Sequence, residues 1–240
     1  MILELKEITK VYGNHLIIDG LTLTMDKPEI FGLLGPSGSG KTTLVKMIAG
    51  IETPTAGTIH VFGEKMPKLK VMAKFGYMAQ SDALYGELTA KENIEFFAGL
   101  YGMRGKPLKS RMNQVMDAVG LIDELNKQVG QFSGGMKRRL SLAIAMMHEP
   151  KLLILDEPTV GIDPILRKNI WDMFKDLKAG GTGVIVTTHV MDEADKCDRL
   201  GMIRNGKMIA IGEPDALKKE TETSSIEEAF LAFGGAVREK

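Results

Sequence analysis

One segment constrains the fold of this chain more than any other, the glycine-rich stretch GPSGSGKTT at residues 35–43. It fits the pattern G-x-x-x-x-G-K-[ST] and follows EIFGLLG, an apolar run typical of a buried strand. After it, TLVKMIAGI continues at helical spacing. Between a strand and a helix, such a loop lets backbone N–H groups surround phosphate oxygens, and the helix N-terminus adds its positive end. The sequence therefore predicts an α/β fold that binds a nucleotide through its phosphates.

The side chains of this loop have distinct expected roles. Lys41 can reach the β- and γ-phosphates, the hydroxyl of Thr42 can ligate Mg²⁺, and Thr43 is expected to contact the α-phosphate. A purely structural glycine turn is the alternative, and it leaves the lysine and the two threonines unexplained. The residues predicted to contact the nucleotide here are Gly35, Pro36, Ser37, Gly38, Ser39, Gly40, Lys41, Thr42 and Thr43.

Further polar residues follow two other apolar runs, where the carboxyl ends of strands in an α/β sheet gather ligands. LLILDEP places Asp156 and Glu157 after four apolar residues, and VIVTTH ends at His189. We expect Asp156 to hold Mg²⁺ through water, and Glu157 to act as general base or to orient an attacking water. His189 is predicted to contact the γ-phosphate. Taken alone, two acids can be a solvated turn and the histidine a surface residue.

A second glycine segment lies nearly a hundred residues after the first, in QFSGGMKRRL at residues 131–140. Ser133 is a predicted N-cap for the helix that MKRRLSLAIAMM favours, and the free N–H groups of its first turn form an anion site. This segment has no phosphate-loop lysine in a G-K-[ST] position, no metal ligand and no base of its own, so it is half of a site. A capped helix start without any ligand is the alternative.

Composition excludes several classes of protein. The 240 residues carry 31 basic and 31 acidic side chains, whereas dedicated nucleic-acid proteins usually have a basic excess. The single cysteine, Cys197, excludes an intrachain disulfide and is expected to be structural. No run approaches the roughly 18 apolar residues of a membrane span, and MILELKEITK does not resemble a signal peptide. We therefore expect a soluble chain that reaches a membrane only through a partner.

Apolar spacing predicts the order of the elements. Strands are expected at residues 2–13, 17–25, 58–63, 74–79, 151–158 and 182–189, with a hairpin over 198–212 that turns at Asn205-Gly206. Helices are expected over 87–102, with Ile94, Phe97 and Leu100 on one face, and over 109–122, with Met112, Val115, Met116 and Val119 on one face. Two more are expected over 164–180 and 224–235. The predicted division is a core of 1–80 and 149–212, a helical part of 81–148 and a tail of 213–240.

Taken in order, GPSGSGKTT, Gln80 after KFGYMA, SGGMKRRLSLA, LLILDEP, GIDP and TTH resemble an ATP-binding cassette ATPase over essentially the whole chain. The resemblance implies a P-loop NTPase core with a RecA-like mixed sheet, an N-terminal antiparallel β subdomain and a helical insert. It also implies ATP and Mg²⁺ as ligands, and a head-to-tail dimer in which Ser133, Gly134 and Gly135 contact the ATP of the partner subunit.

The resemblance assigns further residues one by one. Tyr12 matches the aromatic residue that stacks on adenine, and Gln80 matches the residue that touches Mg²⁺ and the attacking water. Asp163, in GIDP, matches the loop that crosses between subunits, although Ile162 stands where the family more often has leucine. Met136 replaces the commoner glutamine, and SGGMKRR resembles the branch that exports drugs, polysaccharides and lipids.

The resulting prediction is the ATPase subunit of an exporter, active as a homodimer or as a heterodimer with another cassette subunit. It would lie at the cytoplasmic face of the membrane, held by separate integral membrane permease subunits. Candidate docking residues are Leu84, Tyr85, Phe96, Phe97 and Tyr101, with ordinary helix core as their alternative. The rival functions are a soluble cassette ATPase acting on nucleic acid or ribosomes, a nucleotide-switched module without catalysis, and a metabolic P-loop kinase.

Overall fold

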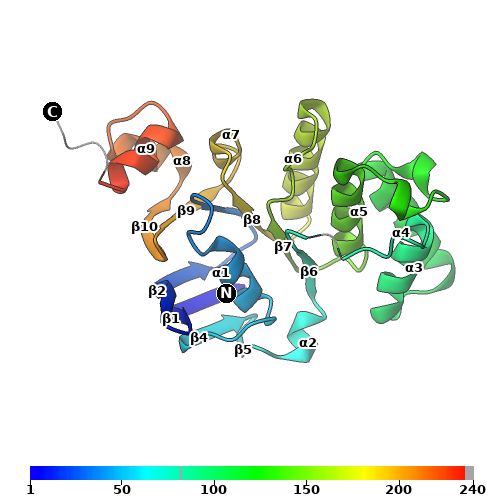
Figure 1. Cartoon of the computed structure of the whole chain (residues 1–240), viewed down its shortest axis with the longest axis horizontal. Helices are drawn as coiled ribbons and strands as arrows, with labels where there is room; N and C mark the ends of the chain where they lie inside the picture. Colours follow the sequence, from blue (N-terminus) through cyan, green and yellow to red (C-terminus); the bar gives the residue numbers. More distant parts are fainter. Residues whose placement is uncertain (82, 236–240) are drawn as a thin grey trace. The chain divides into compact units, whose positions relative to one another are not determined.

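The computed structural model describes residues 1–81 and 83–235 (Figure 1). The chain forms two compact units: Met1–Met72 together with the segment from Gly183 onward, and Ala73–Thr182. Within the described ranges, no helix combines the length and the apolar character needed to cross a bilayer. The domain boundaries after residues 80, 148 and 212 stay predictions, and residues 236–240 of the predicted tail lie outside the described residues.

The first unit contains an antiparallel sheet in the order β2-β1-β4-β5. Its strands are β1 (Leu3–Tyr12), β2 (His15–Met25), β4 (Ala56–Val61) and β5 (Glu64–Lys65). Leu3 pairs with Met25 on one side and with Val61 on the other, and all three side chains are buried. The alternating pattern of the first 25 residues thus forms the predicted strand pair, with one face in the core.

The first unit also holds a mixed set of strands around β3 (Ile30–Leu34), which is parallel to both β8 (Gly183–Thr188) and β9 (Arg199–Arg204). All side chains of β3 and β8 are buried, as expected of strands covered on both faces. β9 continues antiparallel into β10 (Lys207–Gly212). At the turn, Asn205 and Gly206 have φ angles of 50° and 78°, so the predicted Asn-Gly hairpin is confirmed.

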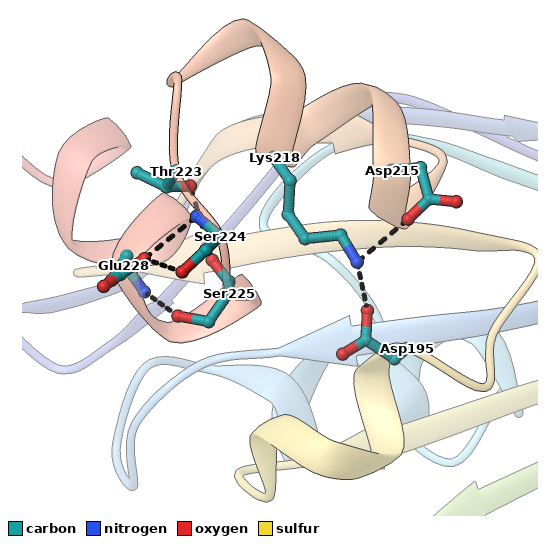
Figure 2. Close-up of polar contacts among 7 residues, drawn as sticks. All are labelled: Asp195, Asp215, Lys218, Thr223, Ser224, Ser225 and Glu228. Carbon is teal, nitrogen blue, oxygen red and sulfur yellow. Dashed lines mark hydrogen bonds and ion pairs between the residues drawn. The ribbon is translucent and has the colours of Figure 1, made fainter.

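Five helices described in this unit are α1 (Lys41–Ile48), α2 (Leu69–Met72), α7 (Met191–Ala194), α8 (Pro214–Glu220) and α9 (Ile226–Phe233). Figure 2 shows how the last three are held. Lys218 on α8 lies 2.9 Å from carboxylate oxygens of both Asp195, directly after α7, and Asp215. Ser225 caps α9 by accepting the N–H of Glu228 at 3.2 Å.

Cys197 has the structural role that the sequence predicts. Its side chain is buried, and burial raises the pKa of the thiol well above its usual value. A Cβ atom on Gly32 would lie 2.7 Å from the cysteine sulfur, so β3 and this thiol are in close contact. The thiol therefore packs as a small apolar group rather than acting as a nucleophile.

The second unit contains two parallel strands, β6 (Phe75–Met78) and β7 (Leu152–Asp156). Its helices are α3 (Ala90–Leu100), α4 (Gly105–Ala118), α5 (Gly134–Met146) and α6 (Pro164–Ala179), with short 3-10 helices η1 (Ile122–Glu124) and η2 (Val129–Gln131). The predicted apolar face Met112, Val115, Met116 and Val119 is buried throughout.

The apolar face predicted for α3 is only partly correct. Ile94 is buried and Phe97 is half-buried, but Leu100 is 70% exposed. The side chains that α3 buries are those of Ala90, Asn93, Ile94 and Ala98. Leu100 is the last residue of the helix, so its side chain leaves the core at the point where the helix ends.

Candidate functional site

The glycine-rich loop lies between β3 and α1, as predicted. Gly38 and Gly40 have φ angles of 79° and 103°, a region that glycine adopts without strain. A Cβ atom on Gly35 would lie 2.3 Å from the carbonyl oxygen of Ile203, so this position requires glycine. The buried side chain of Lys41 folds back over the loop, and its Nζ donates to the carbonyl oxygens of Gly35 at 2.7 Å and Pro36 at 3.0 Å.

Ser39 supplies an independent indication that this loop suits an anion. Its hydroxyl oxygen is buried and has no hydrogen-bond partner among the described residues. A buried hydroxyl without a partner is unfavourable unless a ligand accepts a hydrogen bond from it. A phosphate oxygen within the loop would satisfy it, so the residues present fit the predicted ligand.

His189 follows the strand beside the glycine-rich loop. In the register of β3 and β8, Leu34 pairs with Thr188, so the loop and His189 both leave the carboxyl ends of adjacent parallel strands. The turn after β8 is fixed by Thr188, whose hydroxyl donates to the buried carboxylate of Glu193 at 2.7 Å and accepts the N–H of Val190 at 3.0 Å. The first unit therefore brings His189 and the phosphate loop to one edge of its sheet.

Tyr12 ends β1 in the same unit and is 42% exposed. Its hydroxyl donates a short hydrogen bond to Glu52, and Lys10 Nζ lies 4.8 Å from the centre of its ring. An exposed aromatic ring held at its polar end can offer a face to a flat base, as the predicted role in adenine stacking requires.

In the second unit, two strand ends bring together the other predicted groups. Met78 pairs with Leu155, so Gln80 follows the end of β6 beside the end of β7, where Asp156 and Glu157 lie. Asp156 is buried, whereas Glu157 is half-buried with a φ angle of 53°. A positive φ angle is uncommon for glutamate, and it turns the chain sharply between the two acids. This supports the expectation that their carboxylates serve different roles.

Sequence reasoning missed Arg138 on α5, which binds these same two strand ends. Its guanidinium donates at 2.8 Å to the carbonyl oxygens of Ala79 and Gln80, and at 2.7 Å to that of Glu157. It also donates to the carbonyl of Asp156. A signal was present in the sequence, because helical spacing puts this arginine on one face with Leu142 and Ala145, both apolar.

The second glycine segment begins α5. Ser133 accepts the N–H of Met136 at 3.2 Å, which confirms the predicted N-cap. A Cβ atom on Gly135 would lie 3.0 Å from the carbonyl oxygen of Gly161, so this segment lies against the GIDP loop. There Asp163 caps α6 by accepting the N–H of Leu166 at 3.0 Å. The N-termini of two helices thus lie close together, each with the positive end of its dipole.

The family follows from comparison with known proteins. A family model described as ABC transporter matches residues 18–160. The chain belongs to the ABC transporter family. It is 42% identical over 240 residues to the linearmycin resistance ATP-binding protein LnrL of Bacillus subtilis, covering 95% of this chain and 77% of that protein. It is 40% identical to the Nod factor export ATP-binding protein I of Sinorhizobium fredii, with 99% and 69% covered.

A further relative is longer. The probable multidrug ABC transporter ATP-binding protein YbhF of Escherichia coli is 40% identical over 96% of this chain, but the match spans only 41% of that protein. Among solved structures, an ATP binding subunit of an ABC transporter superposes with a TM-score of 0.90 at 28% identity, covering 98% of this chain and all of the other. The dimeric cassette MJ0796 superposes with a TM-score of 0.83 at 27% identity over 88% and 98%.

These comparisons confirm the predicted fold class, a P-loop NTPase with an N-terminal antiparallel sheet and a helical part. They also exclude the metabolic P-loop kinase, because the match covers the SGG segment as well as the phosphate loop. Another solved structure shows MJ0796 as a dimer in a post-hydrolysis state bound to ADP and Pi.

Proposed function

We propose that this chain is the ATP-binding and ATP-hydrolysing subunit of an ABC transporter, and that it powers export through separate membrane subunits. The observation that carries this proposal is the phosphate loop. It combines an inward-folded Lys41, a buried Ser39 hydroxyl that a phosphate would satisfy, and His189 at the adjacent strand end. The relatives named for multidrug export, linearmycin resistance and Nod factor export support the direction of transport.

For hydrolysis we assign each polar group one task. Thr42, Gln80 and Asp156 offer the oxygen ligands that Mg²⁺ prefers, and Mg²⁺ when bound would neutralise charge on the β- and γ-phosphates. Glu157 orients and deprotonates the attacking water, and His189 contacts the γ-phosphate. Tyr12 stacks on adenine, and residues 35–43 hold the phosphates.

We assign Ser133, Gly134 and Gly135 to the ATP of a partner subunit. The capped N-terminus of α5 favours an anion but lacks the G-K-[ST] lysine of the phosphate loop, so it completes a site that another subunit begins. Asp163 and its loop lie against this segment and would cross the same interface. The dimeric cassette structures of MJ0796 support the arrangement. The partner is a second copy of this chain or another cassette subunit.

The permease subunits would dock on an apolar hollow of the second unit. A cavity of about 240 Å³ is lined by Leu84, Phe97, Leu100, Tyr101 and Ile144, among others. Tyr85, Phe96 and Phe97 form an aromatic cluster beside it, with ring centres 5.0–6.0 Å apart. Tyr85, Phe96 and Tyr101 are exposed and Leu84 and Phe97 are half-buried, so all five residues retain surface that a partner could contact. An exposed apolar hollow of this kind suits an apolar segment of a partner.

This docking would hold the chain at the cytoplasmic face of the membrane. The balanced charge of the chain argues against the rival cassette function on nucleic acid or ribosomes, since neutralising phosphates takes a basic surface. The purely switching module is disfavoured because Lys41, Glu157 and His189 are all present.

The Glu157→Gln variant tests the catalytic assignment. It should bind MgATP and accumulate as a dimer, with ATP turnover reduced at least about a hundredfold, because a general base contributes a factor of roughly 10²–10⁴. Size-exclusion chromatography with MgATP and a phosphate-release assay measure the two effects. Glu227→Gln, an exposed acid on α9, is the control and should keep wild-type turnover. Turnover near wild type in Glu157→Gln would refute the assignment of the base.

Mixing Lys41→Ala and Ser133→Arg subunits tests the shared site. In the mixed dimer one composite site carries both defects and the other carries none, so each mixed dimer should have about half of the wild-type turnover. In an equimolar mixture about half of the dimers are mixed, so activity should recover to about a quarter of wild type. Activity no higher than that of the separate variants would contradict a site shared between subunits.

A further inference from the structure

Arg138 links three segments of the second unit through one side chain. It is 7% exposed and lies on α5, the helix that Ser133 caps. Its Nη1 donates at 2.8 Å to the carbonyl oxygens of both Ala79 and Gln80. Its Nε and Nη2 donate to the carbonyl oxygen of Glu157, at 3.2 Å and 2.7 Å. A buried guanidinium thus ties α5 to the backbone at both strand ends.

The geometry requires arginine. Only its planar fork directs several N–H groups in fixed directions, whereas lysine offers one compact ammonium on a flexible stem. Hydrogen bonds from a charged donor are roughly twice as strong as neutral ones, and carbonyls left unpaired in a buried site are unfavourable. This side chain therefore helps to fix the position of the backbone that carries Gln80 and Glu157 relative to α5.

We propose that Arg138 is a positioning residue for ATP hydrolysis. It connects the half-site at the start of α5, which contacts the partner's ATP, to Gln80 and Glu157, which act on the ATP of its own subunit. The inference rests on the proposed function, because it assigns Gln80 and Glu157 to the attacking water. Removing the guanidinium frees the carbonyls at both residues, and the water-orienting groups shift. Displacements of about 1 Å at such groups can reduce rate by roughly a hundredfold without loss of substrate binding.

The neighbouring Arg139 provides a matched control. It lies on the same helix and donates to the backbone carbonyls of Val119 and Gly120, each at 3.0 Å, and at 3.4 Å to that of Gly135 one turn earlier in α5. These carbonyls lie directly after α4 and within α5, and none belongs to either strand end. Arg138→Met and Arg139→Met each remove a guanidinium from α5 and keep an unbranched stem, so a general loss of stability should affect both variants.

The first experiment compares kcat, KM for ATP and melting temperature in the two variants. We expect Arg138→Met to lower kcat at least about tenfold with KM changed less than about twofold, and Arg139→Met to lower the melting temperature with kcat largely kept. Arg138→Lys should have a kcat between those of Arg138→Met and wild type. If Arg138→Met does not fold, Arg138→Lys is compared with Arg139→Met in its place. Equal effects of the two methionine substitutions on kcat would overturn the proposal.

A dimer with one intact ATP site then locates the effect. Lys41→Ala in one subunit and Ser133→Arg in the other leave a single working site, to which the Ser133→Arg subunit contributes Gln80 and Glu157. Adding Arg138→Met to that subunit should reduce turnover at least about tenfold, and adding it to the Lys41→Ala subunit should change turnover less than about twofold. If turnover falls only when Arg138→Met is in the Lys41→Ala subunit, Arg138 supports only the SGG segment, and the proposal is wrong.

The same measurements separate this inference from the proposed function. If Glu157→Gln retains turnover, or if the one-site dimer is inactive before Arg138 is changed, the proposed function is wrong. If both behave as expected and Arg138→Met keeps wild-type kcat, only the role of Arg138 is wrong.

Discussion

The hydroxyl oxygen of Ser133 accepts a hydrogen bond from the backbone N–H of Met136, at a distance of 3.2 Å. This bond fixes the first turn of α5 through the backbone of residue 136, whatever side chain that residue carries. The methionine side chain is half-buried. The departure from the commoner glutamine therefore leaves the helix cap intact, which explains how the segment can accept either residue.

Met136→Gln should retain ATPase activity, with kcat within about threefold of wild type, because both residues are unbranched and have similar helix propensities. The measurement is a phosphate-release assay at saturating ATP. Met112→Gln is the contrasting control, since Met112 is buried on α4 and its replacement should lower the melting temperature. Loss of activity in Met136→Gln would mean that the methionine makes a functional contact of its own.

Ser133→Ala should lower both stability and activity. The lost cap destabilises α5 by about 1 kcal/mol, and the half-site loses its hydroxyl. Ser225→Ala is the matched control, because Ser225 caps α9 with the same 3.2 Å bond from the N–H three residues on (Figure 2). Chemical unfolding should show similar losses in the two variants, whereas only Ser133→Ala should lose ATPase activity. An equal loss of activity in both would reduce Ser133 to a structural cap.

Much of this fold was predictable because turns, helix caps and helix faces depend on residues that are close together in the sequence. The Asn205-Gly206 turn, the Ser133 cap and the buried face of α4 follow from rules that span at most four residues along the chain. The strand-end placement of His189 was predictable too, because parallel strands align their carboxyl ends.

Contacts between distant segments escaped prediction. The bonds of Arg138 reach carbonyl groups 58 and 59 residues earlier in the chain, and backbone carbonyls carry no sequence signal. The exposure of Leu100 depends on where α3 ends relative to the core, which helical periodicity alone does not fix. The contact between Gly135 and Gly161 likewise arises from packing.

His148 should make the stability of the protein sensitive to mild acid. Its ring stacks on Tyr101 with centres 3.6 Å apart, its Nε2 lies 2.6 Å from the carbonyl oxygen of Phe75, and burial lowers the pKa of the imidazole. The unfolded chain therefore takes up this proton at a higher pH than the folded chain. Protonation favours unfolding, so the free energy of unfolding should fall as pH drops below about 6.5.

Urea unfolding at pH 7.5 and pH 5.5 measures this dependence. The loss on acidification should be smaller in His148→Gln than in wild type. His15→Gln removes an exposed histidine and keeps His148, so it controls for the substitution itself. If His148→Gln loses as much stability on acidification as wild type does, the acid sensitivity comes from other groups.

Replacing glycine by alanine should have opposite effects at Gly35 and Gly99. At Gly35 the added Cβ atom would lie 2.3 Å from the carbonyl oxygen of Ile203 and 2.8 Å from Ser39 Oγ, so the loop backbone must move. At Gly99, inside α3, nothing lies within 4 Å of the added atom. Alanine there restricts the unfolded chain and favours the helix, which stabilises by about 0.5–1 kcal/mol.

We therefore expect a lower melting temperature and weaker ATP binding in Gly35→Ala, and an equal or higher melting temperature with unchanged ATP binding in Gly99→Ala. Thermal unfolding with and without MgATP provides both readouts, because a ligand that binds the folded state raises the melting temperature more when it binds more tightly. Ser39 Oγ also lies close to the Cβ position of residue 35. Adding Ser39→Ala to Gly35→Ala should nevertheless restore little of the stability that Gly35→Ala loses, because the closer clash is with the backbone carbonyl of Ile203. Full recovery in that double variant would show that the hydroxyl, and not the carbonyl of Ile203, makes glycine necessary at residue 35.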